Sequence, residues 1–430
     1  MCGIVGCIGR ERLVSWLLEG LEKLEYRGYD SAGIAVHTGQ EICIYKAQGK
    51  LENLKQLLNG NSENESVKSG IGHIRWATHG VPNQTNAHPH CSFENKVSIV
   101  HNGIIENYKE LRKELTDKGF VFKSQTDTEV IAHLLEEQLG TGNDYMGAIR
   151  STLKKLNGAY ALGVIFRECP DVLYAARKSA PLILGIGEGC NFIASDVPAL
   201  LEQTKNVIYL EDGEIVEIKN NSYQISDING NILSKEPEVL PWEPVAISKK
   251  GFKHFMLKEI HEQPDVIRQT LFDKLRSISE PISLKEVMLT REQIEKLDRI
   301  QVIACGTSLH AALVGKYLIE EFTGIPVDVE ASSEYIYKRT IVGANSITIG
   351  VSQSGETADT ITAIKQAKAL GSHILVITNR PDSTMARDAD SLLPINAGFE
   401  VSVAATKSYS AQLLAFYLFA IYLAEIKKSL

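Results

Sequence analysis

The sequence has no excess of positive charge, no leader-like N-terminus and no apolar run of membrane-spanning length. Its net charge is −8, so it lacks the basic footprint of a protein that binds nucleic acid or a membrane surface. No basic region precedes an apolar run at the N-terminus, and the apolar run at 413–424 is too short to cross a bilayer. We therefore predict a cytoplasmic protein that binds neither nucleic acid nor membranes, with a buried or packing helix at 413–424.

Cysteine pairs at zinc-binding spacing are also missing. The seven cysteines are scattered and odd in number, which fits reduced thiols in the cytosol better than a disulfide framework. We predict no metal site and no cofactor. What the chain does have is an ordinary globular composition, with 44% hydrophobic and 23% charged residues, and a length of 430 residues that suffices for two or three domains.

The chain begins Met-Cys-Gly-Ile-Val-Gly. Removal of Met1 would leave Cys2 with a thiol nucleophile and a free α-amine, whose pKa of about 7.7 to 8.0 suits a base near neutral pH. Gly3 and Gly6 allow close backbone approach, and residues 4–5 begin a predicted buried strand. A chance Met-Cys start is the plain alternative, so this motif alone is weak evidence for a nucleophile.

Two arginines lie in polar segments next to predicted regular elements. Helical spacing of apolar residues predicts a helix over 13–24, and the loop 25–33 after it contains Arg27, which the turn-forming glycines of that loop do not explain. A strand is predicted over 71–77 and contains Arg75 near its end. Because a guanidinium can hold a carboxylate through two parallel hydrogen bonds, Arg75 is a candidate to bind a substrate carboxylate.

Histidines His79, His88 and His90 follow this strand and raise the question of a metal site. Their spacing matches neither a helical nor a finger pattern, and prolines interrupt the segment. A polar loop is therefore favoured over metal binding.

A strand predicted over 97–101 runs into Asn102 and Gly103. A side-chain amide and a glycine backbone N–H at a strand end are suitable donors for an oxyanion hole. Asn-Gly is also the strongest short signal for a hairpin turn, and spacing alone favours the turn. Asp127 offers a similar choice, because it fits either a cap of the helix predicted over 130–139 or a partner for a substrate ammonium.

The middle of the chain indicates a change from sheets to another kind of domain. Short apolar segments between 158 and 228, separated by turn residues, predict strands of one or two sheets. Prolines concentrated in 236–244 mark a boundary, and helical segments near 256–277 and 283–297 follow it. The predicted parts of the chain are a domain over 2–230, a linker with helices over 231–290, and a second domain over 291–430.

From 301 to 378 strands and helices alternate, which predicts a doubly wound parallel sheet with helices on both faces. Ligands of such folds bind at the carboxyl ends of the strands, where the loops 305–308 and 352–357 lie. Both loops offer hydroxyls and backbone N–H groups at a helix N-terminus, which suits a sugar phosphate, and neither is a nucleotide-binding motif. Helix capping explains one such loop, but two at successive strand ends favour a ligand.

Together these motifs resemble a known enzyme family. The N-terminal part resembles the glutaminase domain of class II, N-terminal-nucleophile glutamine amidotransferases, and the C-terminal part is similar to a sugar isomerase domain. In this order they resemble the glutamine:fructose-6-phosphate amidotransferases, which make glucosamine 6-phosphate. The resemblance implies an α+β glutaminase domain with αββα layers, followed by an α/β isomerase domain. It rests on residues 1–6, 26–33, 75–80, 101–103, 126–129, 305–308 and 352–360.

The resemblance implies roles for individual residues of the glutaminase domain. Cys2 attacks the glutamine amide while its own amine moves the proton, and it forms a glutamyl thioester that water resolves. Asn102 and Gly103 hold the oxyanion, against the turn that spacing favours. Arg75 binds the α-carboxylate of glutamine and Asp127 its α-amine. The other implied residues are Trp76 in a gate, Thr78 and His79 beside the glutamine, and Arg27, which helps to organise the terminus.

For the isomerase domain the resemblance implies a sugar phosphate site. The substrates are glutamine and fructose 6-phosphate, and ammonia passes between the two sites through an enclosed channel that excludes water. The family is typically dimeric through its isomerase domains, so a homodimer is implied. The residues implied to hold the sugar phosphate are Thr307, Ser308, Ser352, Gln353, Ser354 and Thr357, with Val403 near the sugar.

The chain departs from the family in one respect. Members carry two isomerase domains in tandem and a C-terminal tail, whereas this sequence ends at residue 430, after the first of them. Because the second domain and tail supply the acid–base groups for isomerisation and a lysine for the open-chain sugar, we predict a truncated form with complete glutaminase chemistry and impaired or absent synthase activity. The alternatives are a glutaminase whose isomerase part only senses sugar, and a non-catalytic sugar-phosphate-binding module.

Overall fold

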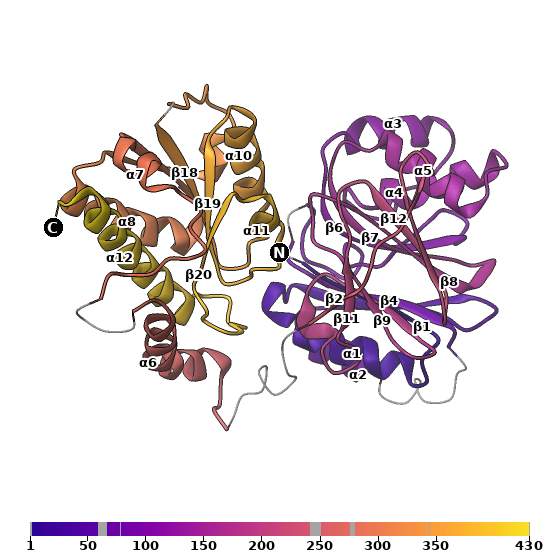
Figure 1. Cartoon of the computed structure of the whole chain (residues 1–430). Helices are drawn as coiled ribbons and strands as arrows, with labels where there is room; N and C mark the ends of the chain where they lie inside the picture. Colours follow the sequence, from indigo (N-terminus) through magenta and orange to yellow (C-terminus); the bar gives the residue numbers. More distant parts are fainter. Residues whose placement is uncertain are drawn as a thin grey trace. The chain divides into compact units, whose positions relative to one another are not determined.

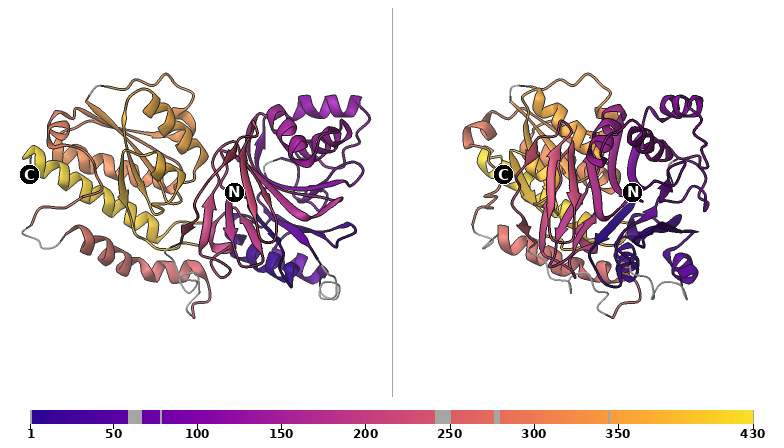
Figure 2. Two further views of the ribbon diagram at one scale, coloured as in Figure 1. Left: turned by 45° about the vertical axis from the view of Figure 1, so that its right-hand side comes forward. Right: turned by 90° about the vertical axis from the view of Figure 1, so that its right-hand side faces the viewer.

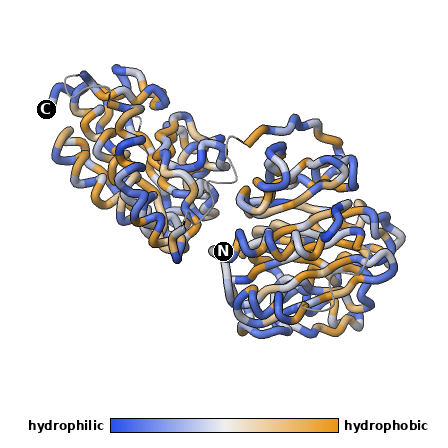
Figure 3. Tube along the Cα trace, turned by 90° about the horizontal axis from the view of Figure 1, so that it is seen from below, coloured by the Kyte–Doolittle hydropathy of each residue, from blue (hydrophilic) through white to orange (hydrophobic). Residues whose placement is uncertain are grey.

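The computed structural model describes residues 2–58, 67–77, 79–240, 251–275, 280–343 and 345–429. The chain divides into two compact units, Met1–Val245 and Ala246–Leu430, which are described separately below. Figure 3 shows hydrophobic segments running through the interior of both units, with hydrophilic residues gathered at their edges. Each unit therefore has a hydrophobic core of its own.

Within the described residues, the first unit contains two antiparallel sheets. The eight strands of the first sheet are, in order across it, β15 (Glu238–Val239), β11 (Asn206–Tyr209), β9 (Ile183–Ile186), β10 (Asn191–Ala194), β1 (Gly3–Ile8), β4 (Ser69–Arg75), β2 (Ser31–His37) and β3 (Ile42–Gln48). The seven strands of the second sheet are β14 (Ile232–Leu233), β13 (Tyr223–Asp227), β12 (Glu214–Ile218), β8 (Cys169–Lys178), β7 (Gly158–Phe166), β6 (Val97–Ile105) and β5 (His90–Cys91).

Helices cover the outer faces of the two sheets, and Figure 1 shows the resulting order of helix, sheet, sheet and helix. The first sheet carries α1 (Leu13–Lys23) and α2 (Leu51–Leu58), and the second carries α3 (Tyr108–Asp117), α4 (Glu129–Gly140) and α5 (Tyr145–Lys155). Two short 3-10 helices are η1 (Glu25–Arg27) and η2 (Val197–Ala199). The predicted αββα layers are confirmed.

Strand β1 is fixed by its place in the first sheet. It pairs with β10 on one side and β4 on the other, and all six of its residues are buried. Ile4 and Ile8 join an apolar cluster between the sheets that includes Val100 and Leu173. Burying an aliphatic side chain of this size contributes about 1.5–3 kcal/mol, so the strand that Cys2 precedes is held firmly.

The second unit contains, among its described residues, a five-stranded parallel sheet with helices on both faces. Its strands are, in order, β17 (Val327–Ala331), β16 (Arg299–Ala304), β18 (Ser346–Ser352), β19 (His373–Thr378) and β20 (Ser391–Pro394). Its helices are α6 (Phe255–Lys274), α7 (Arg291–Lys296), α8 (Gly306–Thr323), α9 (Ser332–Tyr335), α10 (Ala358–Ala369), α11 (Thr384–Asp388) and α12 (Lys407–Lys427). The predicted doubly wound parallel sheet is confirmed.

Helix α12 extends beyond the apolar run at 413–424. With 21 residues it is long and apolar enough to cross a membrane by length and composition alone, and half of its most apolar 18-residue stretch is buried inside the unit. Phe416, Phe419 and Leu423 are fully buried in the core that α8 also lines, and α6 runs beside α12 (Figure 2). The apolar run alone underestimated the helix length, and the predicted buried or packing helix is confirmed.

The segment between the two predicted domains differs from expectation. The prediction of a helix over 283–297 is wrong for its first part, because residues 283–290 are irregular and α7 begins at Arg291. Thr290 decides this start, because its side chain and that of Gln293 form a capping box. Residues 231–240 belong to the first unit, and 241–250 lie outside the described residues. The domain boundaries at 230 and 290 stay predictions.

Candidate active site

Cys2 lies at the start of β1 and next to the end of β4. Its Sγ accepts the backbone N–H of Trp76 at 3.2 Å and lies 3.5 Å from the carbonyl oxygen of Trp76. Burial raises the pKa of the Cys2 thiol, and the Trp76 N–H and the charges of Arg75 and Arg27 oppose that rise. The resting thiol is therefore neutral, and it requires a base before it can attack.

The main chain of Cys2 is held by two side chains from different elements. Its carbonyl oxygen accepts a hydrogen bond from Arg27 Nε at 2.9 Å and another from Asn102 Nδ2 at 3.1 Å. Arg27 also pairs with Asp196 at 3.1 Å, which fixes the guanidinium. The nucleophile is thus anchored at its backbone, while its thiol contacts Trp76.

Asn102 and Gly103 lie inside β6, where they pair with Ala161 and Tyr160 of β7. The hairpin turn that spacing favours is therefore wrong, because the strand continues through both residues to Ile105. Gly103 has a φ of 136°, and a Cβ at this position would lie 2.0 Å from the carbonyl oxygen of Ala159. The close approach of β7 explains why this position requires glycine.

Arg75 and His79 present buried polar atoms without partners. An Arg75 terminal nitrogen donates to the carbonyl oxygen of His79. Among the described residues, however, Arg75 Nη1 and His79 Nδ1 are buried with no hydrogen-bond partner. Such atoms are costly to leave unpaired, so the pair suits a polar ligand. Trp76 is 38% exposed and packs edge-on against Tyr29 at 5.4 Å, and Thr78 lies outside the described residues.

Asp127 is directed to β6 and not to the start of α4. Its Oδ2 accepts the backbone N–H of Ile105 at 2.8 Å, and the N-cap residue of α4 is Thr128, which makes no side-chain capping bond. The capping interpretation of Asp127 is therefore wrong. Burial lowers the pKa of Arg75, and the charges of Asp127 and Asp30, together with Cys2 when its thiol is ionised, oppose this effect. Cys2, Arg75 and Asp127 thus share one electrostatic neighbourhood.

His88 and His90 are buried and pack with His73 of β4, whereas His79 is partly exposed. The rings of His73 and His88 have centroids 4.1 Å apart, and those of His88 and His90 are 4.8 Å apart. Nε2 of His88 and Nδ1 of His101 each lie 2.9 Å from Thr128 Oγ1. Burial lowers the pKa of all four histidines, so the stack is neutral near physiological pH.

Sequence analysis missed His73, whose Nε2 contacts Asn102 directly. A usable signal lay in the alternation of β4, where successive side chains point to opposite faces. Ile71 packs in the core between the sheets, so His73 and Arg75, two and four residues further on, share its face. Polar residues on a face that is otherwise apolar indicate a site.

The predicted sugar phosphate loops follow two adjacent parallel strands. Ala304 at the end of β16 pairs with Val351 near the end of β18, so the loops emerge from the same edge of the sheet. Neither N-cap residue, Cys305 for α8 or Thr357 for α10, makes a side-chain capping hydrogen bond. Plain helix capping does not account for these loops.

The hydroxyls of the loops are ordered by neighbouring groups. Ser352 Oγ accepts the Gly355 N–H at 3.1 Å and lies 2.9 Å from Thr357 Oγ1, with Ser354 Oγ at 3.5 Å. Ser308 is buried and accepts a hydrogen bond from Gln412 Nε2 at 3.0 Å, whereas Thr307 is exposed. The Gln353 carbonyl accepts Asn379 N–H at 3.2 Å, and Val403 is 66% exposed in the segment before α12.

Glu259 is a second residue that sequence analysis missed. It lies in α6, is 1% exposed and accepts the backbone N–H groups of Val401 at 2.6 Å and Ser402 at 3.2 Å. It therefore fixes the chain immediately before Val403. Sequence alone offers little signal for this contact, because the two partners are separated by 142 residues.

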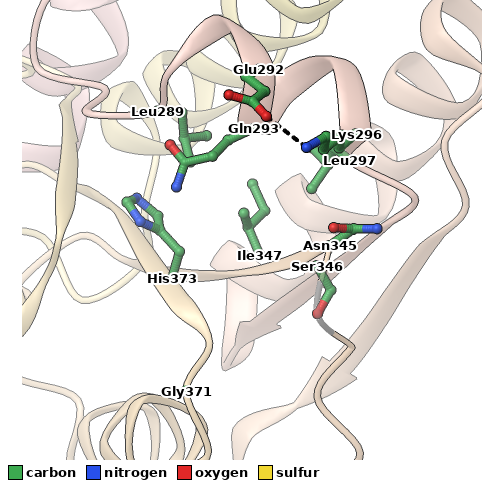
Figure 4. Close-up of a pocket in the computed structure, with 10 residues that line it drawn as sticks. All are labelled: Leu289, Glu292, Gln293, Lys296, Leu297, Asn345, Ser346, Ile347, Gly371 and His373. Atoms are coloured by element: carbon green, nitrogen blue, oxygen red, sulfur yellow. Dashed lines mark hydrogen bonds and ion pairs between the residues drawn. The ribbon is translucent and has the colours of Figure 1, made fainter.

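A separate cavity of about 370 Å³ lies at the other edge of the sheet, beside the first residues of β18 and β19 (Figure 4). Lys296 contributes the cation of this cavity and is bonded to Glu292 at 2.6 Å. With its lysine neutralised, the cavity is a poorer place for a phosphate than the two loops. The residues lining it are Leu289, Glu292, Gln293, Lys296, Leu297, Asn345, Ser346, Ile347, Gly371 and His373.

Comparison with protein families matches each unit to a described domain. The model of the glutamine amidotransferase domain matches residues 73–202, and the model of the SIS domain matches residues 293–422. The first match contains Arg75, Asn102 and Asp127, and the second contains both hydroxyl-rich loops.

Comparison with individual proteins extends the likeness to nearly the whole chain. It is 49% identical over 98% of its length to a protein of Caldanaerobacter subterraneus named glutamine--fructose-6-phosphate aminotransferase [isomerizing], of which it covers 68%. A protein of the same name from Gloeobacter violaceus is 48% identical over 99% of the chain, which covers 69% of it. A solved structure, the allosteric regulatory enzyme of purine biosynthesis, matches with a TM-score of 0.50 at 19% identity, covering 95% of this chain and 94% of that one.

Proposed function

This chain belongs to the family of glutamine--fructose-6-phosphate aminotransferases (isomerizing), which are class II glutamine amidotransferases, and we propose that its first unit releases ammonia from glutamine with Cys2 as the nucleophile. The carrying observation is that a neutral thiol and an anchored Cys2 carbonyl lie near buried polar atoms of Arg75 and His79 that have no partner among the described residues. We also propose that the glutamine amidotransferase domain comprises residues 2–230.

The first chemical step forms a thioester. After removal of Met1, the α-amine of Cys2 takes the thiol proton as Sγ attacks the amide carbon of glutamine. The carbonyl oxygen becomes an oxyanion, which Asn102 and the backbone N–H of Gly103 stabilise by hydrogen bonds. The C–N bond then breaks, and the amine returns the proton to the leaving ammonia. Water attacks the thioester in the second step, which releases glutamate and restores the thiol.

Glutamine is held at its α-carbon end by opposite charges. Arg75 Nη1, which has no partner among the described residues, supplies a donor for the α-carboxylate, and Asp127 faces the α-ammonium. Thr78, His79 and Trp76 complete this end of the site, with the half-exposed Trp76 acting as part of a gate. Arg27 organises the terminus through its bond to the Cys2 carbonyl.

The second unit binds fructose 6-phosphate in our proposal. The phosphate lies against the backbone N–H groups at the starts of α8 and α10, where the helix dipoles favour an anion. The hydroxyls and amide that hold it are those of Thr307, Ser308, Ser352, Gln353, Ser354 and Thr357, with Val403 near the sugar. Ammonia reaches this sugar from the first unit without mixing with solvent, since free ammonia at neutral pH is mostly ammonium. The protein acts in the cytoplasm, and pairs as a homodimer through its isomerase domain.

A paired assay tests the proposal. The purified chain is given glutamine and fructose 6-phosphate, and glutamate and glucosamine 6-phosphate are followed together. We expect Cys2-dependent glutamate release, with Cys2→Ala reducing it to background. Equal amounts of both products support the complete synthase reaction, and glutamate alone supports a glutaminase. Absence of glutamate in the wild-type chain would contradict the proposal and favour a non-catalytic sugar-phosphate-binding module.

The requirement for a free α-amine has its own test. A chain with an uncleavable N-terminal tag lacks the proposed base, whereas the same tag at the C-terminus leaves it intact. We expect the N-terminally tagged form to lose glutaminase activity and the C-terminally tagged control to keep it. Intact-mass measurement of the control should show loss of Met1. Full activity of the N-terminally tagged form would contradict the role of the amine.

A further inference from the structure

One ring nitrogen of His73 contacts both a backbone carbonyl and the Asn102 side chain at the proposed oxyanion hole. His73 Nε2 lies 3.0 Å from the carbonyl oxygen of His101 and also 3.0 Å from Asn102 Oδ1. A backbone carbonyl can only accept a hydrogen bond, so Nε2 must carry the hydrogen. The contact with His101 therefore decides the tautomer of His73.

His73 keeps this single hydrogen because it stays neutral. The residue is fully buried, and burial lowers its pKa to about 3. Its other ring nitrogen, Nδ1, is buried without a hydrogen-bond partner among the described residues, which fits an unprotonated atom in a ring that packs against His88. The imidazole thus presents one fixed donor toward Asn102.

The fixed donor decides the orientation of the Asn102 amide. Because Nε2–H donates, the group that faces it must be the oxygen Oδ1, and the NH2 group is left on the other side. That group donates to the carbonyl oxygen of Cys2 at 3.1 Å. An NH2 group has two hydrogens, so a second N–H is left for the reacting carbonyl oxygen of a substrate. A flipped amide would place two donors against each other.

The strands make this arrangement rigid. His73 lies in β4 directly opposite Ile4 of β1, and Ile4 is two residues after Cys2. Its ring reaches from the first sheet to β6 of the second sheet, where His101 and Asn102 lie. The same side chain therefore ties the strand that follows Cys2 to the strand that carries the oxyanion donor.

We propose that His73 is a positioning residue of the glutaminase reaction, holding the Asn102 amide so that its NH2 group faces Cys2. The proposal rests on the glutaminase function proposed above. It predicts that His73 acts on catalysis through Asn102 and makes no contact with glutamine.

A double-mutant cycle on the full chain tests this coupling. His73→Leu removes the donor at similar volume, and Asn102→Ala removes the amide. Loss of one oxyanion donor lowers kcat by about 10²–10³-fold in other enzymes, and we expect His73→Leu to lower kcat at least tenfold with the KM for glutamine changed less than about threefold. In the Asn102→Ala background, His73→Leu should change kcat less than about threefold. Multiplicative effects of the two substitutions would overturn the proposal.

Two further variants separate positioning from stability. In His73→Gln the amide nitrogen is three bonds beyond Cβ, as Nε2 is in histidine, so it should restore most of kcat. His90→Gln changes a buried histidine of the same stack that contacts Thr126 at 3.1 Å and not Asn102. It should lower the unfolding temperature and leave kcat unchanged. If His90→Gln lowers kcat as much as His73→Leu does, the effect is structural and the proposal fails.

The tautomer can be measured without activity. In protein labelled with 15N-histidine, the nitrogen shifts and couplings of His73, assigned with His73→Gln, should show Nε2–H and an unprotonated Nδ1 across pH 6 to 8. The opposite tautomer would overturn the inference even if the enzyme is active. If instead wild-type chain and Cys2→Ala are equally inactive while the tautomer is as described, the proposed function fails and the geometry stands.

Discussion

At the scale of single residues, the candidate site combines satisfied backbone atoms with unsatisfied side-chain atoms. The Cys2 carbonyl oxygen accepts two hydrogen bonds, whereas Arg75 Nη1 and His79 Nδ1 have no hydrogen-bond partner among the described residues. Leaving buried polar groups unpaired costs about 1–3 kcal/mol each, and a bound carboxylate would remove the cost at Arg75. Removal of this cost therefore contributes to the binding free energy of the ligand.

Arg75→Lys tests this at the residue scale. Lysine keeps the charge but replaces the planar fork with a point charge, so the α-carboxylate loses a bidentate partner. A charged hydrogen bond contributes about 1.5–3 kcal/mol, so the KM for glutamine should rise about 10–100-fold with kcat changed much less. Arg112→Lys is the matched control, because Arg112 lies in the same unit and donates to the Ser124 carbonyl at 2.9 Å. An unchanged KM in Arg75→Lys would exclude a direct contact.

At the scale of elements, α4 carries a buried histidine. His133 is 1% exposed between the rings of Phe120 and Phe122, and its Nε2 lies 3.6 Å from the Glu129 carboxylate, whose charge opposes the effect of burial. Burial lowers its pKa to about 4. In the unfolded chain its pKa is about 6.5, so the unfolded state binds more protons between these values.

The sign of the pH effect follows from this difference. Stability is full above about pH 6.5 and is lost as the pH falls toward 4, by up to about 1.4 kcal/mol per pH unit for this histidine. His133→Leu removes the titrating group at similar volume, so the slope of unfolding free energy between pH 6.5 and 5 should decrease by up to one proton. Urea unfolding followed by tryptophan fluorescence measures the first unit, because Trp16, Trp76 and Trp242 all lie within 1–245. An unchanged slope would contradict this assignment.

The contact between α8 and α12 also makes an element-scale prediction. A Cβ on Gly315 of α8 would lie 2.3 Å from Cδ1 of Phe416 in α12. Alanine is the better helix former, but here overpacking should dominate and cost about 1–3 kcal/mol. Hydrogen exchange of α8 and α12 should accelerate about tenfold or more in Gly315→Ala.

Gly140→Ala is the matched control for this substitution. Gly140 ends α4, and a Cβ there would meet nothing within 4 Å. The same chemical change should therefore be neutral or stabilise by up to about 1 kcal/mol, from helix propensity alone. Equal exchange rates in wild type and Gly315→Ala would show that the two helices can move apart with no loss of stability, and would contradict the predicted overpacking.

At the scale of the whole molecule, the two units have separate cores. The apolar clusters of the first unit contain residues up to Leu233, and those of the second begin at Val266. The proposed glutaminase residues all lie in the first unit. This separation predicts that the first unit folds and works without the second.

Expression of residues 1–245 alone tests this independence. We expect a folded fragment whose glutaminase kcat lies within about threefold of that of the full chain, since every residue proposed for that chemistry is retained. Cys2→Ala in the fragment is the control for background hydrolysis. A folded but inactive fragment, beside an active full chain, would show that the second unit contributes to the glutaminase site.

The sequence by itself determined the classes of the two folds and many of the candidate residues. Short apolar segments between turn residues and the strand-helix alternation after 301 are local patterns, so they identified the strands of one or two sheets and a parallel sheet, and the family resemblance added the αββα layers. The functional groups at the chain start and in short motifs are also local features, so they pointed to Cys2, Arg75 and the two hydroxyl-rich loops. The first part of the helix predicted over 283–297 was wrong, because helical periodicity does not show where a capping box such as Thr290 with Gln293 starts the helix.

Only the tertiary structure decided what depends on neighbours distant in sequence. Asn102-Gly103 has the sequence of a turn, yet pairing with β7 draws it into a strand. Asp127 has the position of a cap, yet its carboxylate bonds to Ile105 of β6. The contacts of His73 with Asn102 and of Glu259 with Val401 join elements far apart along the chain. Such pairings are set by how sheets and helices pack, and no local pattern of residues specifies them.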